Sequence, residues 1–194
     1  MKKIVSLLLT LVLCFSMLLT LTSCFFKHPI ENFAEKMAKA NNYQISITLS
    51  DVPLLGTFTI TEKVDGNITY TPAVLFDGEC YTETVGNVVY TYTQNEDGTW
   101  TKSQSETDDS SSVWSDDNMN DLFNPDNFEK VKGEKNTYKQ KAGVVFDTMD
   151  DVVIVVTDES CTINMSMVVD GLTCGVKIVI SKLGAIDLTL PTVK

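Results

Sequence analysis

Four Asp-Gly pairs divide most of the chain into short segments, and they constrain its fold more than any other feature. The pairs are Asp65-Gly66, Asp77-Gly78, Asp97-Gly98 and Asp170-Gly171, and Gly86-Asn87 is a fifth turn sequence. Such dipeptides supply the positive φ angles that tight β-hairpin turns require. The segments between them are rich in Thr, Val, Ile and Tyr, which favour strands. The sequence therefore predicts a largely antiparallel β fold.

The hairpin around Asp170-Gly171 has the clearest predicted register. A two-residue turn there places Cys161 opposite Ile180 and Cys174 opposite Met167. The apolar residues of both strands then share one face and the polar residues share the other, which is how strand register is normally set. The predicted apolar face consists of Cys161, Ile163, Met165, Met167, Val169, Leu172, Cys174, Val176, Ile178 and Ile180.

Two other segments are harder to interpret. At Asp65-Gly66, a two-residue turn would mix apolar and polar residues on each face, so we expect a three-residue loop. That loop would collect on one face the apolar residues Phe58, Ile60, Ile68 and Tyr70. Segment 148–160 is rich in β-branched residues, which favours a strand, but its periodicity does not exclude a helix.

One amphipathic helix is predicted before the strands. Ile30, Phe33 and Met37 recur at helical spacing, and Pro29 suits a first helical turn because its missing N–H has no intrahelical partner there. The helix should end near Asn41-Asn42. We therefore expect an α+β protein, mostly antiparallel β, with this N-terminal helix packed on the sheet.

The first residues are typical of a secretory signal. Two lysines precede an apolar run from Ile4 to Leu21, and small residues follow. Leu21-Thr22-Ser23-Cys24 resembles a bacterial lipobox. This resemblance implies a diacylglycerol thioether on Cys24, followed by cleavage after Ser23. An uncleaved membrane anchor and ordinary secretion are the alternatives.

These expectations define a domain organisation. Residues 1–23 would be a lipoprotein signal peptide, 24–29 the lipidated cysteine and a tether, and 30–194 a single domain. Within that domain, the Ser/Asp-rich segment 103–118 has little to bury, and we expect a mobile loop there. The acyl chains on Cys24, palmitate among them, would hold the protein at the extracytoplasmic face of a bacterial membrane.

The charge of the chain limits its partners. Its formal net charge is −11, and it contains no arginine. Because phosphate neutralisation depends on clustered Lys and Arg, we do not expect nucleic acid as a partner. An anionic membrane surface would repel such a chain, so the lipid on Cys24 must provide the attachment.

Residues for catalysis or metal binding are scarce. The single histidine, His28, falls in the predicted tether, so a histidine-dependent triad is not expected. Paired cysteine spacings for zinc are missing. The segment from Asp116 imitates the first ligands of an EF-hand but lacks its Gly and its final Glu, which leaves a solvated acidic loop or a weak calcium site. We expect no enzyme activity, cofactor or metal.

Three cysteines belong to the predicted domain. In the register above, Cys161 and Cys174 lie about 20 Å apart along the hairpin. A disulfide between these two is therefore not expected, because bonded cysteines have Cα atoms within about 7 Å. Buried free thiols are the favoured interpretation, with a bond from Cys80 to one of the others as the alternative.

The order of elements resembles the LolA/LppX-like lipoprotein-carrier superfamily. The resemblance rests on "IENFAEKMAKAN" followed by "NYQISITL", then "GECYTETVGNVVYTYTQNEDGTWTK", "LFNPDNFEKVKGEKNTYKQK" and "VISKLGAIDLTLP". It implies a half-barrel, a strongly curved meander sheet, that holds an apolar or lipidated ligand in a cavity beneath the helix. The residues expected to line that cavity, if they do not simply pack the core, are Phe33, Met37, Phe58, Ile60, Met165, Met167, Cys174 and Val176. The arginine latch of the periplasmic carrier has no counterpart, so its transfer mechanism is not implied.

A different class of function remains open. The protein would then be a surface interaction module with a closed core that binds proteins or glycans through exposed aromatics such as Tyr92, Trp100 and Trp114, and through the acidic loop. A hydrolase without a recognisable site is the third alternative. In each case we expect a monomer.

Overall fold

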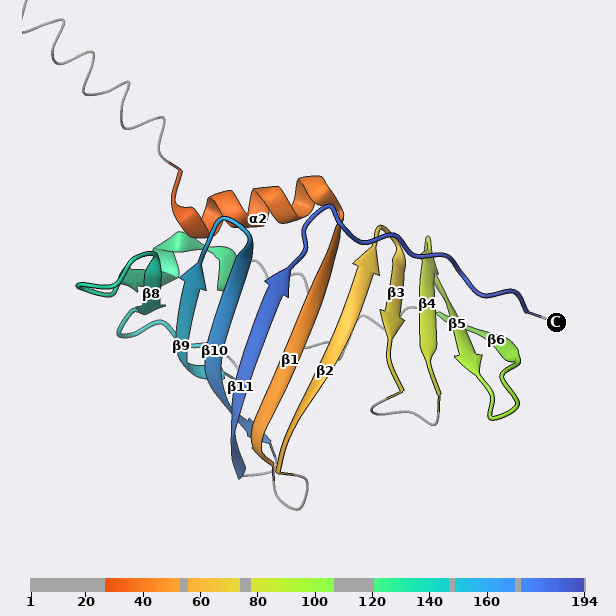
Figure 1. Cartoon of the computed structure of the whole chain (residues 1–194). Coiled ribbons are helices and arrows are strands. Elements are labelled where there is room, and N and C mark those ends of the chain that lie inside the picture. The colour runs from red at the N-terminus through yellow and green to blue at the C-terminus, as the bar shows by residue number, and fades with distance from the viewer. Residues whose placement is uncertain are drawn as a thin grey trace, which may run out of the picture.

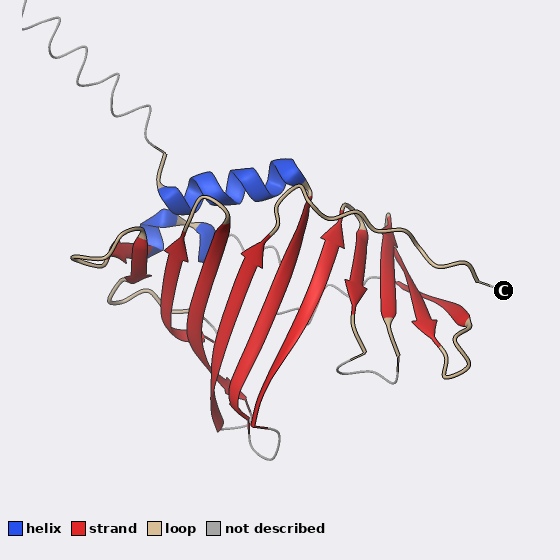
Figure 2. Ribbon diagram, viewed as in Figure 1, coloured by secondary structure: helices blue, strands red, loops and turns tan. Residues whose placement is uncertain are grey.

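The computed structural model describes residues 27–52, 56–73, 78–106, 121–146, 149–169 and 172–193. These residues form a 12-residue helix and a single open, curved sheet (Figure 1; Figure 2). Among the described residues, no helix has both the length and the apolar character needed to cross a membrane. The elements are α2 Pro29–Ala40, β1 Asn42–Val52, β2 Gly56–Asp65, β3 Ile68–Thr71, β4 Cys80–Val85, β5 Val88–Gln94, β6 Trp100–Glu106, the 3-10 helix η1 Pro125–Asn127, β7 Phe128–Lys130, β8 Thr137–Gln140, β9 Met149–Val156, β10 Ser160–Val169 and β11 Leu172–Ser181.

Strand β1 lies in the middle of the sheet. From β1 the chain runs outward through β2, β3, β4 and β5 to one edge at β6. It resumes at the opposite edge with β7 and returns through β8, β9 and β10 to β11, which pairs with β1. All neighbouring strands pair antiparallel. The expected mostly antiparallel α+β fold with an N-terminal helix is therefore confirmed.

The register of the last hairpin is the predicted one. Cys161 pairs with Ile180, and Met167 pairs with Cys174. The turn residues 170 and 171 lie outside the described residues. Along β10 and β11 the predicted apolar positions from 161 to 167 and from 174 to 180 are buried or half-buried, whereas Asn164, Thr173 and Lys177 are exposed. Burial of one face has set this register, as expected.

Segment 149–156 is strand β9, and a bulge explains its ambiguous periodicity. Asp150 and Asp151 are adjacent and both exposed, while Met149 and Val152 on either side are buried. The register with β10 shifts at this point, and Asp151 has a φ of 54°. The bulge inserts one extra residue, so that the inward-pointing residues before it and after it are no longer an even number of positions apart. A strict alternation of apolar and polar residues therefore does not describe this strand.

The three-residue loop expected at Asp65-Gly66 is wrong. Asp65 pairs with Ile68, so the turn has two residues. Ile68 and Tyr70 consequently lie on the face opposite to that of Ile60. The prediction failed because it assumed that apolar side chains keep to one face throughout the sheet.

The first residues of the loop expected at 103–118 form a strand instead. Residues 103–106 belong to β6 and pair with Val88, Val89, Tyr90 and Thr91 of β5. Their side chains are exposed, so backbone hydrogen bonds rather than burial hold them in the sheet. Residues 107–118 of the expected loop, including Trp114 and Asp116, lie outside the described residues.

Helix α2 lies across one end of the sheet and closes the core there (Figure 1). Its Ile30 and Phe33 are almost fully buried against a cluster that contains Ile154, Ile163 and Ile180. The helix ends, as predicted, at Asn41, whose left-handed conformation caps it.

His28, which was expected in a tether, is instead part of the domain. Its Nδ1 accepts a hydrogen bond from the backbone N–H of Ile30 at 3.4 Å. Its ring lies 4.5 Å from the ring of Tyr138, measured between centroids. Partial burial lowers the pKa of the imidazole, so His28 caps α2 mostly as a neutral acceptor at neutral pH.

Replacing Ile163 with alanine should lower the free energy of unfolding by about 2–4 kcal/mol, because Ile163 is fully buried between Ile154 and Ile178. Urea denaturation would measure the change. Asn164→Ala is the matched control, since its side chain is exposed on the same strand and should change stability by only about 0.5 kcal/mol. Equal losses in the two variants would contradict the described register.

Candidate functional site

The face of the sheet that points toward α2, called here the inner face, carries the apolar residues of the central strands. On β1 these are Ile45, Ile47 and Leu49, which pair with Ile180, Ile178 and Val176 of β11. Most of these residues belong to or pack against the cluster that α2 covers. The inner face is therefore one continuous apolar surface across β1 and β11.

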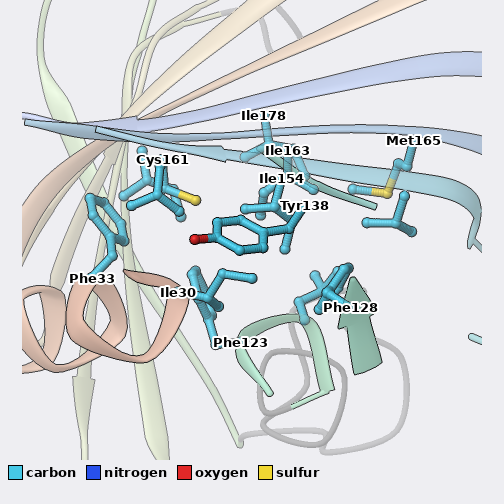
Figure 3. Close-up of a cluster of buried hydrophobic side chains, with 14 of the residues drawn as sticks. Ile30, Phe33, Phe123, Phe128, Tyr138, Ile154, Cys161, Ile163, Met165 and Ile178 are labelled. Carbon is cyan, nitrogen blue, oxygen red and sulfur yellow. The ribbon is translucent and has the colours of Figure 1, made fainter. Parts of the chain in front are cut away.

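The structure places all eight predicted lining residues on this side of the molecule, but it separates them into two groups. Phe33 and Met37 project from α2, and Phe33 lies beside Cys161 at one end of the buried cluster (Figure 3). Met165 lies at the other end of the same cluster (Figure 3). The helix residues and the distal strand residues therefore do not line one compact pocket.

The helix end of the inner face is closely packed. Phe33 is only 2% exposed and stacks on Phe123, with ring centroids 6.4 Å apart. Leu122 is equally buried. Tyr138 is also buried here, with its ring directed at Cys161 and Phe33 (Figure 3). At this end the predicted lining residue Phe33 packs the core.

The end of the inner face away from α2 carries an apolar patch. In one row, Phe58 pairs with Leu49, Leu49 with Val176, and Val176 with Met165. A second row pairs Cys174 with Met167. Phe58, Leu49 and Met167 are partly exposed. The apolar patch, defined as these six residues, thus spans β2, β1, β11 and β10.

The hollows formed by described residues elsewhere are polar or small. One of about 480 Å³ lies on the opposite, outer face and is lined by charged residues such as Lys139, Lys141, Asp150 and Asp151. Another, of about 140 Å³, lies beside the start of α2 and includes Phe33. Neither has the apolar lining that an acyl chain requires.

Glu62 is an unexpected carboxylate on the inner face. It pairs with Ile45 and follows Phe58 and Ile60 on the same side of β2. Its Oε1 accepts a hydrogen bond from Thr71 Oγ1 at 3.4 Å. Burial raises its pKa, because water solvates the carboxylate incompletely. The sequence signal for this position is an acidic residue at an inward position of an alternating strand.

Beyond β2 the inner face changes character. On β3 to β6, called here the wing, the inner face is lined mainly by Thr and Ser, with one cysteine and one valine. The residues are Thr69, Thr71, Cys80, Thr82, Thr84, Val89, Thr91, Thr93, Thr101, Ser103 and Ser105. Glu62 therefore stands at the boundary between an apolar surface and a hydroxyl-rich one.

The outer face of the wing carries an aromatic cluster, defined as Tyr70, Tyr81, Tyr90, Tyr92 and Trp100. Tyr81 lies 5.0 Å from Tyr70 and 5.5 Å from Trp100 between ring centroids. Lys102 lies over the rings of Tyr90 and Tyr92, at 3.9 and 4.9 Å from their centroids. Desolvation and the acceptor Glu79 raise the pKa of Tyr70 to about 12. Such cross-strand contacts stabilise the strands of the wing.

The cysteines of the domain are unpaired. Cys80, Cys161 and Cys174 are free, so the favoured interpretation of free thiols is confirmed and the alternative bond from Cys80 is not formed. Cys161 and Cys174 are buried on the inner face, and Cys80 is half-buried on the wing. Burial raises the pKa of Cys161 to about 12.

Comparisons with protein-family models and with curated proteins find no match to this sequence.

The three thiols should differ in their reaction with a maleimide at pH 8. At a pKa of about 12, only about one Cys161 in ten thousand is a thiolate at that pH, and its side chain is fully buried. Cys80, which is partly exposed, should therefore be modified first and Cys161 only after unfolding in urea. Peptide mass spectrometry measures the order, and modification of Cys161 as fast as Cys80 in the folded protein would contradict the described burial.

Proposed function

We propose that this protein is a lipid-anchored extracytoplasmic binding protein that holds an apolar or lipidated ligand against the inner face of its sheet. The observation that carries the proposal is the apolar patch. It is continuous across four strands and lies away from the helix, and its residues Leu49, Phe58 and Met167 are partly exposed. The curved sheet would act as the half-barrel that the resemblance to LolA/LppX-like carriers implies.

Physical chemistry favours an apolar ligand on the patch. Covering apolar surface stabilises a complex by about 25 cal/mol per Å² removed from water. Met165 and Met167 have flexible thioether side chains, which adapt to ligands of variable shape. No described polar side chain interrupts the rows of the patch, so an acyl chain would meet no unsatisfied hydrogen-bonding group there.

The anchor would place the domain close to the membrane. Four residue steps separate Cys24 from His28, and at most about 3.6 Å per step they span about 14 Å. His28 is held against Tyr138 and caps α2. A lipid on Cys24 would therefore keep the beginning of α2 near the bilayer surface, within reach of lipid or lipidated ligands.

A photoreactive alkyl diazirine probe added to the purified full chain tests ligand binding. We expect crosslinks at the partly exposed residues of the apolar patch, Leu49, Phe58 and Met167, and competition by unlabelled fatty acid. Met167→Asp should reduce crosslinking at least about tenfold, because an acyl chain would have to desolvate the new carboxylate. Asn164→Asp is the matched control, since it adds the same charge on the exposed face of the same strand.

Other crosslinking patterns would contradict the proposal. Equal losses in Met167→Asp and Asn164→Asp would show a nonspecific charge effect. Crosslinks confined to the aromatic cluster would instead support a second candidate function, binding of proteins or glycans on the outer face. That candidate is favoured by the gathering of Trp100 with four tyrosines on the outer face of the wing. The expectation that Tyr92 is exposed is wrong, because its side chain is only 6% exposed.

The lipid anchor has its own test. Alkyne-labelled palmitate fed to bacteria that express the chain should label the wild type, and Cys24→Ser should abolish the label. Cys14→Ser is the control, because Cys14 would leave with the signal peptide. Mass spectrometry should find a mature chain that begins at Cys24. Retention of the label in Cys24→Ser would exclude this cysteine as the attachment site.

A further inference from the structure

We propose that the ligand of the apolar patch is a cationic amphiphile, whose acyl chain lies on the patch and whose ammonium group pairs with Glu62. This inference rests on the proposed function, because it assigns the polar end of a ligand whose apolar end that function requires. Glu62 and the apolar patch lie on the same face of the sheet, and β2 contributes a residue to both.

The spacing along β2 fits one ligand across both features. Phe58 and Glu62 lie four residues apart on the same side of the strand, which corresponds to about 13 Å. Ile60, between them, is buried and apolar. Between Glu62 and the partly exposed Phe58 and Leu49, the inner face of β2 therefore carries no other charge.

The charge of Glu62 is not compensated within the described part of the chain. The ion pairs found there join Lys27 to Glu35 and Lys139 to Glu129. Lys63, the next residue along β2, projects from the opposite face and lies over Tyr70. The contact with Thr71 is long, at 3.4 Å. A half-buried carboxylate of this kind gains most from a cation that arrives with a ligand.

Charge complementarity also selects against other head groups. The chain carries a formal charge of −11, and Glu62 would face the head group directly, so a phosphate or sulfate would be repelled. A neutral head group would leave the carboxylate unpaired. An ammonium group both neutralises Glu62 and leaves the hydroxyl of Thr71 free to contact the polar end of the ligand.

Competition for the diazirine probe on the full chain tests the inference. Three dodecyl amphiphiles are compared below their micelle concentrations, with trimethylammonium, maltoside and sulfate head groups. We expect the ammonium compound to compete at concentrations at least about tenfold lower than the other two. It should also outcompete its uncharged tert-butyl isostere, a comparison that needs no variant. Equal competition by all head groups would overturn the inference while leaving the proposed function intact.

Two substitutions separate a specific contact from overall charge. Glu62→Gln should bring the preference for ammonium below about threefold, and Glu62→Asp should restore part of it. Glu96→Gln removes the same charge from an exposed turn and should leave the preference unchanged. A preference that survives in Glu62→Gln would overturn the inference. If neither the probe nor any amphiphile binds the wild type, the proposed function itself fails.

Discussion

The pairing of β1 with β11 is the interaction on which the rest of the structure depends. It joins two meanders, β1 to β6 and β7 to β11, into one sheet, and it makes the inner apolar rows continuous. The strands approach so closely that a Cβ on Gly175 would lie 2.4 Å from Ser50 Oγ. A side chain at position 175 would therefore force the Ser50 hydroxyl, which donates a hydrogen bond to the Gly175 carbonyl, to move away.

The sheet uses its two faces differently on the two sides of β2. In the central strands, apolar residues point toward α2, whereas on the wing the aromatic residues point outward and the hydroxyl groups point inward. The change occurs without a break in pairing, because cross-strand contacts among Tyr70, Tyr81 and Trp100 support the strands of the wing, which no helix among the described residues covers. The inner face therefore offers a ligand two chemically distinct surfaces that meet at Glu62.

The sequence predicts those structural features that depend only on neighbouring residues, and it does not predict those that depend on distant parts of the chain. The hairpin from Cys161 to Ile180 was predictable in full, because one face is buried and alternation is strict. The bulge at Asp151 and the short turn after Asp65 were not, since each breaks the assumption of a single apolar face. Glu62 was overlooked because one acidic residue in an alternating strand resembles an ordinary surface position until the strand on either side is known. The separation of Phe33 from Met165 follows from where α2 crosses the sheet, which helical periodicity alone does not specify.

The position of β1 also has a consequence for how the chain is made. The hydroxyl of Ser50 donates a hydrogen bond to the carbonyl of Gly175, which lies 125 residues later in the chain. Strand β1 is therefore synthesised first, but its second neighbouring strand, β11, is synthesised last. Until β11 emerges, Ile45, Ile47 and Leu49 have apolar side chains and an unpaired backbone edge exposed to other chains. Such late, non-local closure slows folding and favours aggregation. Chaperones that bind exposed apolar strands would therefore act on this chain mainly in the interval before β11 pairs with β1.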